Sequence, residues 1–151
     1  MSPLPDPHPA SAAARIGTTT YVSSILPWRG CGSGAPWVGG NHASRTENAV
    51  SELVSNVAGA RPLVWGGDWN HALTGREYAG SQGGRRAVLA ALDTLGLEAP
   101  TATLPHAIED LLSIDHVAVP LGIEATASRV SAQCDGKRLS DHDAYVLDVE
   151  V

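Results

Sequence analysis

The stretch that decides the expected fold is PLVWGGDWN, residues 62–70. It opens on a short apolar run, which is typical of a strand buried on both faces of a sheet. Two glycines end the run, and Asp68 follows them directly. The pattern therefore predicts a central strand that delivers a carboxylate to a functional loop at its exit.

The segments on either side predict an α/β or α+β domain. Strands are expected at 18–26, 112–119, 123–130 and 143–151, and helices from Asn41 or Ser44 to about Gly59 and at 85–95, stopped by Gly96. The order β-α-β-α-β-β-β predicts one mostly antiparallel mixed sheet with covering helices. Residues 1–16 begin with four closely spaced prolines and are expected to form an irregular lead-in to a domain at 17–151.

Composition excludes several classes of protein. The 151 residues are 43% hydrophobic, which is enough for a core, and two cysteines cannot build a disulfide scaffold. No apolar run is long enough to span a bilayer and the first residues do not resemble a secretory signal, so we expect a cytoplasmic protein. Ten basic against sixteen acidic residues give a charge of −6, which argues against tight, sequence-blind binding of nucleic acid but leaves a phosphate substrate open.

Three short acidic motifs lie at expected strand ends: GDWN at 67–70, SIDH at 113–116 and SDH at 140–142. In an extended chain, Asp68 and Asn70 point to one face. A carboxylate there can accept a proton from water or bind a hard cation, and an amide can donate to a phosphoryl oxygen. An ordinary Asx turn at the end of a strand explains the same letters and stays open.

The SDH motif places Asp141 beside His142, whose proton affinity lies near neutral pH. If Asp115 reaches His142, its carboxylate fixes the ring tautomer and favours imidazolium, which can stabilise charge on a phosphate. Asp141 would then be left to bind a divalent cation or its water. A plain surface turn before the last strand is the alternative.

Taken together, the strand-then-GD-x-N, I-D-[YH] and terminal S-D-H elements resemble the last three signatures of the endonuclease/exonuclease/phosphatase family. The likeness covers about residues 18–151. The family includes apurinic-site endonucleases, deoxyribonucleases, sphingomyelinases and inositol polyphosphate phosphatases. The resemblance implies a four-layer α/β sandwich, of which this chain would be the C-terminal part, and hydrolysis of phosphoesters with Mg²⁺ or a related cation such as Mn²⁺.

The resemblance also implies a role for each matched residue. Asp68 would orient or deprotonate the attacking water, and Asn70 would hold the scissile phosphate. Asp115 would pair with His142, which contacts the phosphate, and Asp141 would join Asp68 in a metal and water network. Nuclease or phosphodiesterase activity is the first expectation, with small phosphate esters and lipid head groups open as substrates.

Two departures from the family pattern favour a second hypothesis. No long segment precedes residue 18 to carry the Asn and the metal-binding Glu of the family's N-terminal half, and Ser24-Ile25-Leu26 stands where many members have T-H-L. A cation held by Asp68, Asn70 and Asp141 alone would be weakly bound. The alternative is therefore a non-catalytic fragment or module whose exposed sheet face needs an oligomer or a partner half.

Other polar and aromatic residues have weaker claims. Trp28 and Arg29 could stack on a base and grip a phosphate, although a loop tryptophan is more often a packing anchor. His71 and His116 allow a zinc site with His142, but their spacing matches no standard zinc pattern.

Overall fold

The computed structural model describes residues 1–149. Its strands and helices are, in chain order, β1 (Ser2–Leu4), β2 (Ser11–Ile16), β3 (Thr19–Ser24), α1 (His42–Val57), β4 (Leu63–Asp68), α2 (Gln82–Leu95), β5 (Leu97–Glu98), a 3₁₀ turn (Pro100–Thr103), β6 (Asp115–Pro120), β7 (Ala125–Val130), β8 (Gln133–Cys134), β9 (Lys137–Arg138) and β10 (Ala144–Val149). The last expected strand falls at β10, but its Val151 lies outside the described residues.

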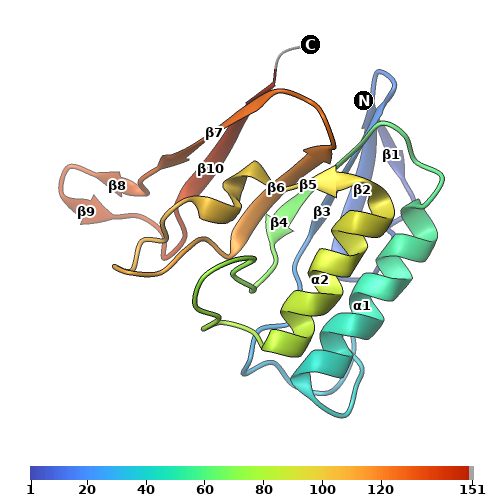
Figure 1. Ribbon diagram of the computed structural model, residues 1–151, viewed down its shortest axis with the longest axis horizontal. Coiled ribbons are helices and arrows are strands. Elements are labelled where there is room, and N and C mark those ends of the chain that lie inside the picture. The colour runs from blue at the N-terminus through green and yellow to red at the C-terminus, as the bar shows by residue number, and fades with distance from the viewer. Residues whose placement is uncertain (150–151) are drawn as a thin grey trace.

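Six strands form one mixed sheet in the order β1-β2-β3-β4-β6-β5. Only β3 and β4 run parallel, joined through α1, and the other neighbours are antiparallel. Figure 1 shows α1 and α2 side by side over one face of this sheet. The expected α/β class, with a mostly antiparallel mixed sheet and covering helices, is confirmed.

The core lies between the helices and the sheet. The indoles of Trp65 and Trp69 are fully buried there, with ring centroids 4.2 Å apart. Leu53 of α1 and Val88 of α2 pack into the same cluster. Because two large aromatic rings fill this space, the core needs no phenylalanine, and the central strand is held where it ends in Asp68.

Both helices begin at side-chain caps. Asn41 caps α1 by accepting a hydrogen bond from the backbone N–H of Ser44, whose hydroxyl bonds back to complete a capping box. The Ser81 hydroxyl caps α2 by accepting a hydrogen bond from the backbone N–H of Gly84, so the second helix starts earlier than its apolar spacing predicts. Gly96 ends it in the left-handed conformation, as expected.

Residues 1–16 correct one expectation, because they are not an irregular lead-in. They form β1 and β2, which pair antiparallel with each other, and β2 continues onto β3. Pro3 is tolerated because β1 is the edge strand, where a missing N–H breaks no ladder. The four prolines therefore mark an edge strand and its turn.

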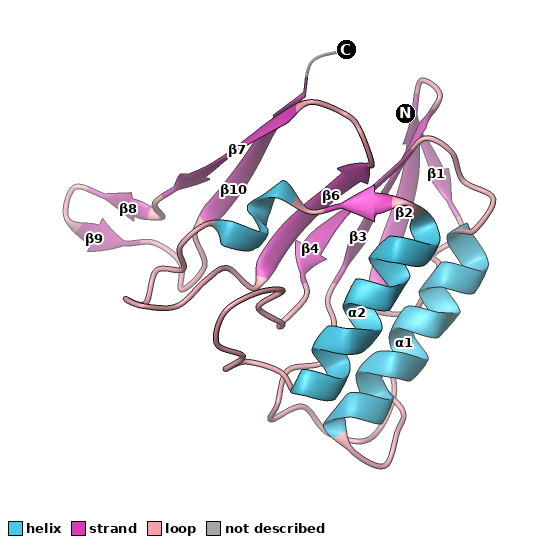
Figure 2. Ribbon diagram, in the orientation of Figure 1, coloured by secondary structure: helices cyan, strands magenta, loops and turns pink. Residues whose placement is uncertain are grey.

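A second, smaller unit consists of β7 and β10, which form an antiparallel ribbon, with the β8–β9 hairpin between them in the chain. Figure 2 shows the ribbon standing beside the main sheet, apart from the helices. It contacts the rest of the molecule through β6 and the 3₁₀ turn. The segment that enters β10 consequently arrives next to the start of β6.

Candidate active site

Two carboxylates face each other where two inner strands of the main sheet, β4 and β6, meet the loops at one end of the sheet. Asp68 is the last residue of β4 and Asp115 is the first of β6, and the antiparallel register pairs these two residues directly. Directly opposed residues place their Cβ atoms about 5 Å apart. The register alone therefore brings together two acids that are 47 positions apart in the sequence.

Gly67 makes the close approach of β4 to β3 possible at this end of the sheet. Its backbone φ is +133°, and a Cβ atom built on it would lie 2.1 Å from the carbonyl oxygen of Ser24 on β3. No other residue type fits this conformation and this contact. The second glycine of the motif thus sets the position from which the next residue, Asp68, leaves the sheet.

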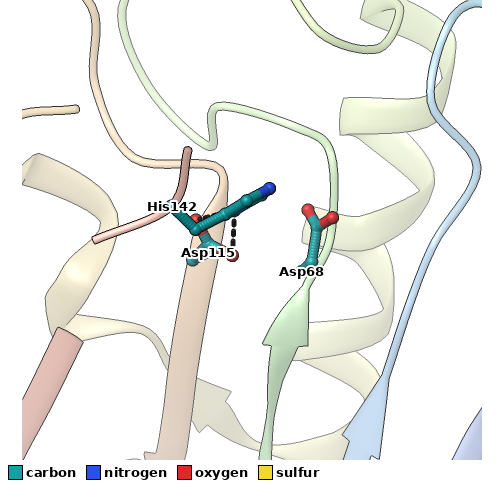
Figure 3. A group of neighbouring side chains, drawn as sticks. All are labelled: Asp68, Asp115 and His142. Carbon is teal, nitrogen blue, oxygen red and sulfur yellow. Dashed lines mark hydrogen bonds and ion pairs between the residues drawn. The ribbon is translucent and has the colours of Figure 1, made fainter. Parts of the chain in front are cut away.

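His142 completes the group from the segment before β10. Its Nδ1 lies 2.9 Å from Oδ2 and 3.1 Å from Oδ1 of Asp115. A carboxylate can only accept, so Nδ1–H donates and Nε2 is left free for another partner. Figure 3 shows that ring edge directed to the side on which the Asp68 carboxylate lies.

Asp115 affects the proton affinity of both of its neighbours. Burial, and next the nearby charge of Asp115, raise the pKa of Asp68. The hydrogen bond that His142 donates to Asp115 raises the pKa of His142 against the opposing effect of burial. The site therefore favours an imidazolium beside two carboxylates.

One ligand-type atom from each of Asp68, Asp115 and His142 lies within 4.8 Å of the others. A hollow of about 210 Å³ opens beside the two carboxylates, lined also by Asp143 and Tyr145. Carboxylate oxygens suit a hard divalent cation, and a cation would relieve the repulsion between Asp68 and Asp115, which adds to burial in raising the pKa of Asp68. The donor set therefore fits a divalent metal with few protein ligands.

Asn70 shapes the loop next to this group. It adopts a left-handed conformation with φ of +53°, is 8% exposed, and donates from Nδ2 to the carbonyl of Leu26 at 3.0 Å. Its backbone N–H donates to Oδ1 of Asp68 at 3.1 Å, which is the geometry of an Asx turn. The Asx-turn interpretation therefore describes its local role here, and its contact with a phosphate stays a prediction.

Three further expected residues lie outside the group. The Asp141 side chain is exposed, although its charge contributes to raising the pKa of His142. Arg29 uses Nε and Nη2 to donate to the carbonyl of Gly80 at 3.1 and 3.0 Å. Trp28 is 43% exposed and packs edge-on against Trp37, 5.0 Å between ring centroids. Their roles in metal or substrate binding stay predictions.

The two histidines considered for zinc are buried and bonded to main-chain or hydroxyl groups. His71 Nδ1 lies 2.6 Å from the carbonyl of Trp69, and His116 Nε2 lies 2.9 Å from the carbonyl of His71. Nδ1 of His116 is 3.2 Å from the hydroxyl of Thr101. These contacts indicate structural histidines beneath the candidate site.

Sequence reasoning missed the charged residues of the ribbon and its hairpin that lie around the segment carrying His142. Asp143 is bonded by Arg129 and Arg138, and all three lie close to the segment that carries the histidine. The only signal in the sequence is that Asp143 directly follows the SDH motif. Nothing in the spacing of the two arginines indicates that both converge on it.

Solved structures with a similar fold include an exonuclease, a 3' phosphatase and an endonuclease domain. A 3'-5' exonuclease (NExo) from Neisseria meningitidis superposes with a TM-score of 0.66 at 18% identity, over 97% of this chain and 67% of that one. The 3' phosphatase NExo from Neisseria bound to a product DNA hairpin gives 0.68 at 17%, with the same coverage. The endonuclease domain of TRAS1, a telomere-specific non-LTR retrotransposon, gives 0.55 at 17%, over 93% and 63%.

At these identities the likeness shows the fold, which is endonuclease/exonuclease/phosphatase-like. The chain spans about two thirds of the length of these structures. No family model matches the chain, and a search of curated proteins finds no match. None of the helices within residues 1–149 is long and apolar enough to cross a lipid bilayer.

Proposed function

We propose that this protein hydrolyses phosphoester bonds with the help of a divalent cation. The observation that carries the proposal is the contact of His142 with Asp115, opposite Asp68 on the neighbouring strand. Three distant segments supply this group, and it stands at one end of the sheet beside a hollow. The solved structures of the same fold include an exonuclease and a 3' phosphatase, which supports this class of reaction.

Each residue has a role that its geometry allows. Asp115 holds the His142 ring and favours its protonated form, so that Nε2–H can donate to a phosphate oxygen as negative charge grows there. Asp68 faces the same space and can orient a water molecule for attack on phosphorus or accept its proton. Asn70 would contact the phosphate only after releasing its bond to Leu26.

The divalent cation would be held mainly by Asp68, with Asp115 and Asp141 nearby. Bound there, it would neutralise charge on the phosphate oxygens. We propose Mg²⁺ or Mn²⁺, weakly held, because most of the six positions that such a cation fills would be left to water and substrate.

For the substrate we propose a nucleic acid phosphodiester first. One solved structure of this fold is bound to product DNA. The charge of −6 favours a substrate held at few points over a long duplex gripped along its backbone. Small phosphodiesters are therefore the second substrate class to test.

The test measures hydrolysis of bis(p-nitrophenyl) phosphate and of plasmid DNA with Mg²⁺ or Mn²⁺, and cation binding by titration calorimetry. Turnover that falls about 100-fold or more in Asp68→Asn and in His142→Gln supports the proposal. Asp148→Asn is the matched control, because Asp148 is an exposed acid on β10 away from the group. Wild-type protein without metal-dependent turnover would contradict the proposal and favour a module that needs a partner half.

A further inference from the structure

Among the acids of residues 1–149, Asp143, which directly follows His142, has the largest number of hydrogen-bond and ion-pair partners. The side chain of Asp143 is fully buried, and its Oδ2 lies 2.5 Å from both Nε and Nη2 of Arg129. Its Oδ1 accepts from Nη2 of Arg138 and from the backbone N–H of Ala132, each at 2.9 Å. That backbone hydrogen bond, together with the guanidinium groups, lowers the pKa of Asp143 to about 2.

Arg138 has a second contact on the other side of the histidine. The same Nη2 that reaches Asp143 donates to the backbone carbonyl of Asp141 at 3.0 Å. Arg138 therefore bonds the residue before His142 and the residue after it. The two contacts fix the direction of the chain through the intervening position.

Few other contacts hold this position. Within residues 1–149, the backbone N–H of His142 donates to the hydroxyl of Ser140, and the ring contacts Asp115. The His142 side chain is 38% exposed, so no packed core fixes it. The orientation of the ring depends on the course of its own backbone.

We call the contacts of Asp143 with Arg129, Ala132 and Arg138 the Asp143 clamp. This clamp also connects the backbone around His142 to the ribbon. Arg129 belongs to β7, Ala132 directly precedes β8, and Arg138 ends β9. Leu139 N–H closes the base of the hairpin on the carbonyl of Ala132 at 2.8 Å. One carboxylate thus ties three separate segments to the turn that precedes β10.

We propose that Arg138, acting through Asp143 and the carbonyl of Asp141, is a positioning residue that holds the His142 ring against Asp115. Arg129 supports it by fixing the other carboxylate oxygen. Arg138 itself touches no reacting atom in this scheme. The inference rests on the proposed function only for its kinetic consequence, since the orientation of the ring is a property of the protein alone.

Loss of the clamp has a distinct expected signature. A ring that samples several orientations still accepts substrate, but spends less time aligned with phosphate and Asp115. Displacements of about 1 Å at a reacting group cost on the order of 100-fold in rate. We therefore expect kcat to fall between 10-fold and 100-fold in Arg138→Met, with KM changed less than about threefold.

The matched control is Lys137→Met, which removes one positive charge from the same strand. Lys137 is exposed and makes no ion pair within residues 1–149, and alternate residues of a strand point to opposite faces. A lowered kcat in both variants would assign the effect to lost charge and overturn the proposal. Arg138→Lys keeps the charge without the planar fork and is expected to restore only part of kcat.

A second readout needs no activity. In the metal-free protein at fixed pH, ¹⁵N–¹H correlations of the His142 ring report whether Nδ1 carries the proton against Asp115. Arg138→Met is expected to lose or broaden this pattern, and Lys137→Met to keep it. An unchanged pattern in folded Arg138→Met, or in Arg138→Lys if the first variant does not fold, overturns the proposal. If the wild-type protein hydrolyses no phosphoester, the proposed function is refuted. The NMR measurement of the ring still shows in that case whether Arg138 holds His142 against Asp115.

Discussion

A single carboxylate, that of Asp115, serves both halves of the candidate site. Its backbone position opposite Asp68 comes from the register of β4 and β6, while its side chain receives the His142 ring. Both effects have the same sign, because the charge of Asp115 raises the pKa of each of its two neighbours. It therefore makes Asp68 a better proton acceptor and His142 a more persistent cation.

This predicts the outcome of Asp115→Asn. The amide weakens the hydrogen bond that is the main cause raising the pKa of His142 and removes the charge of Asp115, while burial still lowers this pKa, so the ring should titrate at lower pH. If the imidazolium assists the reaction, the alkaline loss of kcat/KM should move to lower pH as well. NMR titration of the ring and a pH–rate profile on bis(p-nitrophenyl) phosphate check both, and an unmoved ring titration contradicts the account.

The sequence predicted some residues of the candidate site better than others. Asp68, Asp115 and His142 were candidates because each follows or precedes an apolar strand within a motif, and the structure brings the three together. Asn70 was a candidate from the same GDWN motif as Asp68, and Arg29 because a guanidinium group can grip a phosphate. Their donors are taken up by the carbonyls of Leu26 and Gly80, which no local pattern in the sequence reveals.

At the scale of elements, strong apolar periodicity and caps were the reliable signals. Both helices and the strands β3, β4, β6, β7 and β10 lie where these signals predict them, within a few residues. The N-terminal hairpin was missed because its strands are rich in proline and alanine and lack alternation. Their pairing depends on β3, which is a tertiary contact.

Two glycines allow a matched test of backbone requirements. Gly67→Ala forces a Cβ into the carbonyl of Ser24 at a φ that other residues avoid, and should cost about 3 kcal/mol or more in unfolding free energy. Gly96→Ala also meets a positive φ but has no atom within 4 Å, so about 1 kcal/mol is expected. Urea unfolding of both variants compares them, and equal losses would refute the role given to the close approach.

At the scale of the whole molecule, buried neutral histidines couple stability to pH. Burial lowers the pKa of His71 and of His116 to about 4, against 6.5 for the ordinary side chain. Between these values the unfolded chain binds more protons than the folded one. Unfolding therefore takes up protons, and stability falls as the pH drops from about 6.5 to 4.

The expected loss approaches about 3 kcal/mol for each of the two histidines when the pH reaches 4. Urea unfolding between pH 7.5 and 4 measures it. His116→Gln should make the dependence on pH shallower, because one of the two groups is removed. A free energy of unfolding that stays constant over this range would contradict the burial assigned to both rings.

The ribbon of β7 and β10 has one further consequence for how the site is put together. Asp68 and Asp115 belong to strands of the main sheet. His142 lies after the exposed connection at residues 121–124, which joins this sheet to the ribbon. A protease that cut this connection would break the covalent link between the two carboxylates and the imidazole, while every backbone bond of the six strands stayed intact. The candidate site is thus assembled from two parts of the fold, and it depends on the contacts that hold the β7–β10 ribbon against β6 and the 3₁₀ turn.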